Sequence, residues 1–272
     1  MSGAQRGRAA SPSAGDRSRS LGNPRVHLRR TASTNELARE LAIAGAPHGT
    51  LVTAAEQTAG RGRQGRRWWA PPGSALLMSL LLRSPPALLP LSAALAVCDA
   101  AGEQARIKWP NDVVVAASPA SSPRPGLAKL AGILIEGRLQ EGWAVLGIGL
   151  NVAVRVQDLP AELRAGAAPA EHPADAGSAS GLPAATLGLT PADDEPTLAL
   201  LLARLARRLA QPAQATLAGW RARDALRGRE IAWASGRGRA DGIDGAGRLV
   251  VCLPDGGRTA LGAGEVHLRE VG

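Results

Sequence analysis

The 272-residue chain contains no phenylalanine and no tyrosine, and it has only six tryptophans and two cysteines. Its hydrophobic core therefore has to be built mainly from Leu, Val, Ile and Ala. Cys98 and Cys252 lie far apart and form no metal-ligand pattern, which favours reduced thiols. No apolar run approaches the ~18 residues of a membrane span, and the N-terminus lacks an apolar secretory segment. We therefore expect a cytoplasmic protein without a membrane anchor.

Positive charge is concentrated near the N-terminus. Residues 1–30 hold seven arginines and one aspartate, which is +6 of the formal net charge of +9 and leaves only +3 for the rest of the chain. Residues 1–24 are rich in Ser, Ala and Gly, so we expect a disordered basic leader. An organellar transit peptide is the alternative, although the leader has no apolar helical face.

The segment G-R-G-R-Q-G-R-R-W at residues 60–68 has three glycines, four arginines and no carboxylate. Glycine lets the backbone approach a ligand closely, and arginine presents a planar charged fork that suits carboxylate and phosphate. Four cations repel one another and glycine loses much entropy on ordering. We therefore expect this loop to be disordered when empty and to fold over an anion. A solvated basic loop is the alternative interpretation.

Secondary-structure signals divide the chain into a larger and a smaller unit. Ser33 and Glu36 form a capping box that begins a helix ending near Gly45. The residue patterns predict further helices at 90–101 and 197–209, and strands of one sheet at 50–54, 74–82, 113–115, 130–135 and 143–148. Residues 116–128 and 160–190 have the composition of connecting loops. Five short strand patterns between residues 230 and 269 predict a small β-barrel.

Five motifs follow one another along the chain. They are T-A-A-E-Q-T-A at 53–59, the basic loop with W-W-A-P-P-G at 60–73, K-W-P-N-D at 108–112, K-L-A-G-I-L-I-E at 129–136 and G-I-G-L-N-V at 147–152. Together they resemble the catalytic domain of biotin–protein ligases, from about Ser33 to the C-terminus. The resemblance implies an α+β fold, in which a mixed-sheet biotin/lipoate ligase-like catalytic domain (25–225) precedes a small C-terminal β-barrel domain (226–272).

The resemblance also implies a reaction in two steps. Biotin, the substrate, is activated with ATP and Mg²⁺ to biotinyl-5'-AMP, and its biotinyl group then passes to a lysine of a biotin carboxyl carrier domain, in acetyl-CoA carboxylase or a related carboxylase. Neither step needs a side-chain nucleophile, which agrees with the lack of a Ser–His–Asp or Cys–His pattern. The enzyme has to hold a carboxylate against a triphosphate and exclude water, which requires cations, dipoles and a lid.

Site residues follow from matching these motifs residue by residue. The resemblance assigns biotin binding to Ser33, Thr34, Asn35, Gln57, Gly60, Arg61, Gly62, Arg63 and Lys129. It assigns ATP binding to Arg61, Arg63, Arg66, Trp68, Lys108, Asn111, Gly147, Gly149 and Asn151. The expected catalytic residues are Lys129, Arg63 and Asp112, and the expected Mg²⁺ ligands are Asp112 and Asn151.

Several of these residues have an ordinary structural alternative. Helix capping alone explains Ser33 and Thr34, and a lysine at the start of a strand, such as Lys129, is commonly an exposed gatekeeper. Trp68 packs over the apolar side of a ligand or anchors the loop. Asp112 is expected to orient Lys129 or a Mg²⁺ ion. The G-I-G sequence at 147–149 is not a Rossmann fingerprint, and it only allows close approach of the backbone to a nucleotide.

Two departures from the family pattern and two other functions have to be weighed. The insertion at 116–128 is expected to be a surface loop, and the divergent sequence after 163 leaves the adenine contacts unassigned. A lipoate– or octanoyl–protein ligase of related fold is disfavoured because those enzymes lack the basic loop. A nucleic-acid-binding protein is disfavoured because about 30 residues before Ser33, without apolar periodicity, are too few for a helix-turn-helix domain. We therefore expect no specific DNA partner.

Overall fold

The computed structural model describes residues 21–117, 126–137, 141–160, 182–262 and 266–268. Most of the expected basic leader, the centre of the 116–128 insertion and much of 160–190 lie outside these ranges. The folded chain begins earlier than the expected boundary at residue 25. The amide of Gly22 donates to the carbonyl of Gly49 at 2.9 Å, and the amide of Leu51 donates to the carbonyl of Pro24 at 2.9 Å.

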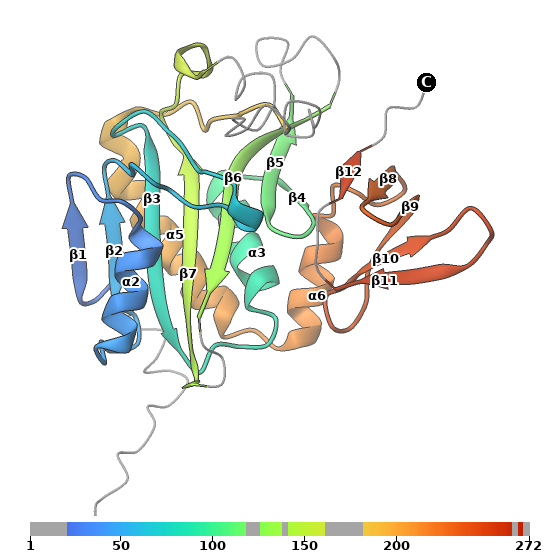
Figure 1. The fold of residues 1–272 in the computed structure, drawn as a ribbon, viewed down its shortest axis with the longest axis horizontal. Helices are drawn as coiled ribbons and strands as arrows, with labels where there is room; N and C mark the ends of the chain where they lie inside the picture. Colours follow the sequence, from blue (N-terminus) through green and yellow to red (C-terminus); the bar gives the residue numbers. More distant parts are fainter. Residues whose placement is uncertain (1–20, 118–125, 138–140, 161–181, 263–265, 269–272) are drawn as a thin grey trace, which may run out of the picture.

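A seven-stranded mixed sheet forms the centre of the larger domain, in the order β1-β2-β3-β7-β6-β5-β4 (Figure 1). Its strands are β1 (Arg25–Leu28), β2 (Leu51–Ala54), β3 (Ala75–Arg83), β4 (Arg106–Lys108), β5 (Asp112–Ala116), β6 (Leu127–Glu136) and β7 (Trp143–Asn151). The pair β1–β2 is parallel, and the other neighbouring pairs are antiparallel. The mixed sheet expected from the sequence is therefore confirmed.

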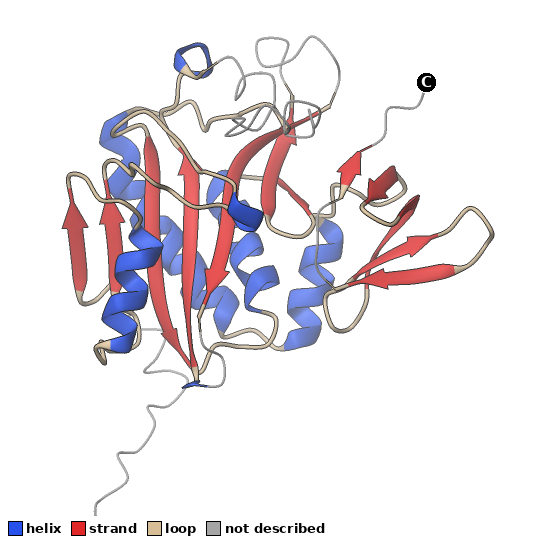
Figure 2. Cartoon of the chain, viewed as in Figure 1, coloured by secondary structure: helices blue, strands red, loops and turns tan. Residues whose placement is uncertain are grey.

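Helices cover both faces of this sheet (Figure 2). On one face, α2 (Thr34–Ile43) packs against β2, β3 and β7. On the other, α3 (Leu89–Ala101), α5 (Asp194–Leu209) and α6 (Ala213–Ala222) pack together. The side chain of Ser33 accepts the Glu36 amide at the start of α2, as the capping pattern predicts. No helix within the described ranges is both long enough and apolar enough to cross a membrane.

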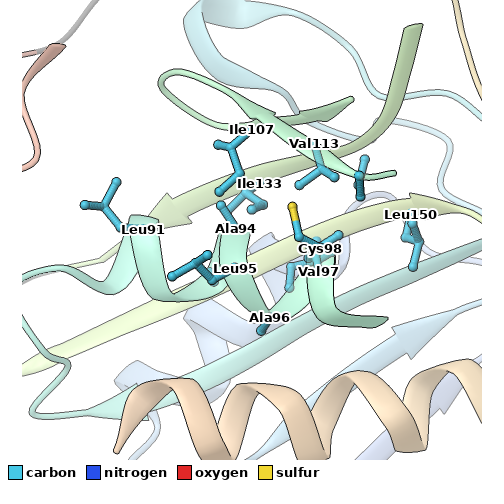
Figure 3. Packing of buried hydrophobic residues seen from close by; sticks show 14 of the residues in the cluster. Leu91, Ala94, Leu95, Ala96, Val97, Cys98, Ile107, Val113, Ile133 and Leu150 are labelled. Atoms are coloured by element: carbon cyan, nitrogen blue, oxygen red, sulfur yellow. The ribbon is translucent and has the colours of Figure 1, made fainter. Parts of the chain in front are cut away.

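The two covered faces explain why the central strands have nearly continuous apolar sequences. In β3, Leu76, Leu80 and Leu82 belong to the large core shared with α3 and α5, whereas Leu81 packs with residues of α2 on the opposite face. Figure 3 shows the large core around Cys98. Both cysteines are free, and burial raises the pKa of the Cys98 thiol to about 12. This thiol therefore remains protonated at neutral pH.

The smaller C-terminal unit is an antiparallel sheet of five strands in the order β11-β10-β9-β8-β12. The strands are β8 (Glu230–Trp233), β9 (Gly236–Ile243), β10 (Leu249–Cys252), β11 (Arg258–Leu261) and β12 (His267–Leu268). A small β domain is thus confirmed. The expected barrel is not found, because the edge strands β11 and β12 do not pair with each other within the described part of the chain.

One face of this small sheet is buried against the larger domain instead of being enclosed by a barrel. Ile231, Leu249 and Val251 belong to the same hydrophobic cluster as Leu95 of α3. The indole nitrogen of Trp109 also donates to the carbonyl of Gly247 at 3.2 Å. The sheet therefore lies beside the β4 edge of the larger sheet, as Figure 1 shows.

Candidate functional site

A pocket lies on the α2 side of the central strands, beneath the basic loop. It is lined by Ser33, Thr34, Asn35, Gln57, Arg61, Gly62, Arg63, Gln64, Arg66, Arg67, Trp68, Met78, Lys108, Pro110, Asn111, Asp112, Lys129, Gly132, Ile133, Leu134, Gly147, Ile148 and Gly149. All the site residues expected from the sequence are in this lining except Gly60 and Asn151. Segments from five separate motifs therefore meet in one place.

The two exceptions are held by structural contacts. A Cβ on Gly60 would collide with the Trp68 carbonyl, so glycine is needed there for the loop to close. Asn151 is buried, and its amide donates to the carbonyl of Ala185 at 2.8 Å. This bond fixes the segment around Ala185, which runs beside Lys129 of β6. The Asn151 side chain therefore does not line the pocket.

The basic loop is closed by its own backbone. The amide of Gly62 donates to the carbonyl of Arg66 at 2.6 Å, and the amide of Trp68 donates to the carbonyl of Gly60 at 2.9 Å. Gln64 has a φ of 56°, which allows the short turn between them. The loop is thus folded over the pocket, and the ordering of this loop by an anion remains a prediction.

One end of the pocket concentrates positive charge around a single carboxylate. Lys129 Nζ lies 2.7 Å from Asp112 Oδ1 and 5.6 Å from the centre of the Trp68 ring. Lys108, in β4, is buried, and this burial lowers its pKa, although Asp112 opposes the shift. Burial also lowers the pKa of Arg63, against the opposing charge of Asp112. Three cations facing one carboxylate leave an excess of positive charge that suits an anionic ligand.

The other end of the pocket is neutral and held by hydrogen bonds. Thr34 donates from its backbone amide to Gln57 Oε1 at 2.7 Å, and its hydroxyl lies 3.0 Å from the same oxygen. Ser79 Oγ lies 2.8 Å from the Thr34 hydroxyl and 2.5 Å from Asn35 Oδ1. Asn35 Nδ2 donates to Glu136 Oε2 at 2.9 Å. Thr34, Asn35 and Ser79 are buried and Gln57 is half-buried, and together they form a fixed surface of the kind that recognises a neutral polar ring.

The glycines of the G-I-G sequence admit side chains of the protein itself. A Cβ on Gly147 would collide with the Asn35 amide, and a Cβ on Gly149 would collide with the Trp68 indole. Gly132 of β6 has the same role, because a Cβ there would lie 2.9 Å from Trp68 Cζ3. Asn35 and Trp68 thus approach these glycines closely, and nucleotide binding at Gly147 and Gly149 remains a prediction.

Sequence reasoning missed Ser79 and Glu136, the two side chains that hydrogen-bond to Asn35. Ser79 is a fully buried hydroxyl within the apolar run of β3, which was a signal that it bonds a polar neighbour. Glu136 is the last residue of the K-L-A-G-I-L-I-E motif, and nothing in the sequence around it indicated its contact with Asn35.

Metal binding is limited by the small number of carboxylates. Within the described ranges, no group of three or more His, Cys, Asp and Glu side chains could hold a metal ion. Asp112 is the only carboxylate among the residues that line the pocket. One carboxylate fits a Mg²⁺ ion that arrives bound to a nucleotide and takes most of its ligands from phosphate and water.

Comparison with known proteins places this geometry in a wider context. Residues 27–152 match the Biotin/lipoate A/B protein ligase family. The chain is 34% identical over 263 residues to a biotin–[acetyl-CoA-carboxylase] ligase of Mycobacterium tuberculosis, covering 88% of this chain and 87% of that protein. It is 41% identical over 145 residues to a bifunctional ligase/repressor of Bacillus subtilis, covering 49% of this chain and only 42% of that relative.

A solved structure extends the likeness to three dimensions. The biotin protein ligase of Aquifex aeolicus, in complex with biotin and ATP, superposes with a TM-score of 0.70 at 25% sequence identity. The match covers 92% of this chain and 100% of the other. Both the seven-stranded and the five-stranded sheet are therefore within the range of the structural match.

Proposed function

Because this chain belongs to the biotin protein ligase family, we propose that it activates biotin with ATP and transfers the biotinyl group to a lysine of a carrier protein. In the first step a carboxylate oxygen of biotin attacks the α-phosphorus of ATP, and pyrophosphate leaves. In the second, the lysine amine attacks the carbonyl of biotinyl-5'-AMP, and AMP leaves. The acceptor we propose is a biotin carboxyl carrier domain of acetyl-CoA carboxylase or a related carboxylase.

The observation that carries this proposal is the division of one pocket into a neutral end and a cationic end. Biotin has the same two ends, a polar uncharged ureido ring and a carboxylate. The hydroxyl and amide groups of Thr34 and Gln57 suit the ring. Lys108, Lys129 and Arg63 suit the carboxylate and the α-phosphate, whose mutual repulsion is the main obstacle to the first step.

We assign the main electrostatic role to Lys129. An ammonium group between the two reactants stabilises the charge that develops on the transferring phosphoryl group. Asp112, at 2.7 Å, holds that ammonium in position and can offer an oxygen to a Mg²⁺ ion carried by ATP. Trp68 and the loop above it exclude water from the mixed anhydride once it has formed.

A biotin-dependent exchange of labelled pyrophosphate into ATP tests this function. We expect exchange with biotin and Mg²⁺, and we expect none with lipoate in place of biotin. Exchange with lipoate alone would assign the chain to the related lipoate ligases. Transfer of labelled biotin to a carrier domain tests the second step. Because the reaction consumes ATP, we propose that it takes place in the cytoplasm.

A further inference from the structure

Asn151, the last residue of β7, is linked to Lys129 through a single residue, Ala185. The side-chain amide of Asn151 donates to the Ala185 carbonyl at 2.8 Å, and the Ala185 amide donates to the Lys129 carbonyl at 2.8 Å. We propose that Asn151 is a positioning residue that acts through Ala185 to direct the Lys129 ammonium into the pocket. This inference rests on the proposed function, in which Lys129 has the main electrostatic role.

The backbone of Lys129 lies where two strands of the sheet separate. Pairing between β6 and β7 ends at Ala131 and Leu150, so it does not reach Lys129. Both backbone polar groups of Lys129 bond to another segment instead. The Lys129 amide donates to the Pro183 carbonyl at 2.7 Å, and the Lys129 carbonyl accepts from the Ala185 amide. This short segment, which runs parallel to β6, takes the place of a neighbouring strand.

On its other side, Lys129 is paired with β5 across an irregular register. Val113 lies opposite Ala131 and Val114 lies opposite Lys129, so Leu130 is an extra residue in β6. Such a bulge changes the direction of nearby side chains relative to a regular strand, and bulges are common beside active sites. The direction of the Lys129 side chain therefore depends on the backbone contacts made beside the bulge as well as on the pairing with β5.

Asn151 holds the segment at its point of contact with Lys129. Ala185 uses its amide for Lys129 and its carbonyl for Asn151, so its backbone is fixed between them. Asn151 is buried, so loss of its NH₂ group would leave the Ala185 carbonyl without a partner. Lys129 Nζ lies 2.7 Å from Asp112 Oδ1 in the present arrangement. Displacing a positioned group by about 1 Å can cost roughly 10²-fold in rate.

A direct role of Asn151 in binding Mg²⁺ predicts a different response to substitution. A metal ligand would use the amide oxygen, and aspartate would supply a charged oxygen with the same reach. A positioning residue uses the NH₂ group, which aspartate lacks. Asn151→Asp and Asn151→Ala both remove this donor, whereas only the aspartate offers a metal ion a stronger ligand.

Single-turnover formation of biotinyl-AMP by the full-length protein, at saturating biotin and ATP, tests the inference. We expect both variants to lose about tenfold in rate, with a biotin Kd within about threefold of wild type. The Mg²⁺ concentration that gives half the maximal rate should not change. In the Lys129→Met background, adding Asn151→Ala should change the remaining rate by less than about twofold, because no ammonium is left to position.

Thr186→Val is the matched control. The Thr186 hydroxyl donates to the Val152 carbonyl at 3.0 Å, so this substitution removes a bond between the same segment and the residue after β7. It leaves the bonds of Ala185 in place and keeps the size of the side chain. We expect its rate to stay within about twofold of wild type. Thermal unfolding checks that each variant is folded.

A wild-type maximal rate in either Asn151 variant would overturn the inference, since Asn151 would then act only on the binding of Mg²⁺ or ATP. Losses that multiply in the double variant would overturn it as well, because Asn151 would then act independently of Lys129. So would an equal loss in Thr186→Val, which would mean that any attachment of the segment matters. A wild-type protein without biotin-dependent pyrophosphate exchange would instead reject the proposed function, and this inference with it.

Discussion

The indole of Trp68 rests on the backbone of Gly149 so closely that a Cβ at that position would collide with the ring. Gly149 lies in β7, which is paired on both sides by β3 and β6, so the strand cannot move away. The added methyl group of Gly149→Ala therefore has to displace Trp68. We expect the adenylation rate to fall between about 10- and 100-fold, because the loop would no longer close correctly over the reactants.

Gly245 provides the matched control for this substitution. A Cβ added at Gly245 would have no neighbouring atom within 4 Å, so Gly245→Ala should leave both activity and stability unchanged. Pyrophosphate exchange measures the activity of the two variants, and thermal unfolding checks their folding. A Gly149→Ala variant with the wild-type exchange rate would mean that the position of Trp68 is unimportant for the chemistry.

Lys129 should contribute to the rate of adenylation more than to biotin binding. Removing a cation that stabilises transition-state charge typically costs about 3 kcal/mol, or roughly 10²-fold in rate. We expect Lys129→Met to lose this factor in single-turnover formation of biotinyl-AMP, with a biotin Kd within about threefold of wild type.

The substitution also leaves Asp112 without its ion pair, 2.7 Å away in the wild type. Adding Asp112→Asn to Lys129→Met removes that unpaired charge and separates the two effects. Stability should recover in the double variant, whereas the rate should not. An unchanged single-turnover rate with a weakened biotin Kd would assign Lys129 to uniform substrate binding.

The strands that could be predicted from the sequence are those whose residues are buried on both faces. The apolar run of β3 and the capping pattern at Ser33 are local signals, and both predictions are confirmed. β1 and α6 were missed because their sequences are short or only weakly apolar. β1 becomes a strand by parallel pairing with β2, a long-range contact that no local pattern encodes.

The site shows the same division between local and long-range information. The glycines at 147 and 149 indicated a close approach, but which group approaches depends on packing between α2, β7 and the basic loop. Likewise, the spacing of strand patterns predicted the small C-terminal sheet. It could not predict whether that sheet closes into a barrel, because this depends on whether another part of the protein covers its apolar face. Burial of Ile231 and Leu249 against the larger domain supplies that cover without a barrel.

Two truncations should locate the start of the folded chain. Residues 1–20 are a basic, Ser- and Ala-rich segment, and deleting them should preserve activity. Deletion through Pro24 also removes the bonds from Gly22 to Gly49 and from Leu51 to Pro24. We expect this second truncation alone to lower the melting temperature. Equal melting temperatures of the two truncated proteins would mean that the folded domain begins at residue 25. Loss of ligase activity on deletion of residues 1–20 would mean that this segment takes part in the reaction.

Asp194, at the start of α5, should make stability depend on pH. Burial, together with the nearby charges of Glu195 and Asp193, raises its pKa from 3.8 to about 6. The folded state therefore binds this proton more tightly than the unfolded chain does, and its contribution to stability increases as the pH falls from about 6 towards 4. Asp194→Asn should raise the free energy of unfolding at pH 7.5 by about 1 kcal/mol, after allowance for solvent screening of a partly exposed group.

This gain should become much smaller at pH 5, where the wild-type carboxyl is mostly protonated. Denaturant titrations at the two pH values measure the difference. Asp193→Asn is the contrasting variant, because hydrogen bonds from the backbone and side chain of Thr190 lower the pKa of Asp193. Its replacement should reduce stability at neutral pH. An equal effect of Asp194→Asn at both pH values would show that the carboxyl titrates normally.

Biotin and ATP together should protect the basic loop from trypsin. Its arginines are tryptic sites, and Arg66 and Arg67 are exposed. The Trp68 indole nitrogen has no hydrogen-bond partner among the described residues, so lifting the ring from Gly149 breaks no hydrogen bond of the ring. Four cations near one another favour opening, and a bound carboxylate or phosphate favours the closed loop. The conformational entropy of the loop is lost when the first ligand binds, so the second ligand binds more tightly.

Mass spectrometry of the fragments identifies the cleaved bond and allows an internal control. Arg258, whose side chain is 64% exposed on β11, lies in the small domain, and cleavage there should not change with ligands. Cleavage after Arg66 or Arg67 should slow at least tenfold with both ligands present and much less with either one, because ordering the loop requires charge at both the carboxylate and phosphate positions. Equal rates of loop cleavage with and without both ligands would show that the loop does not act as a lid.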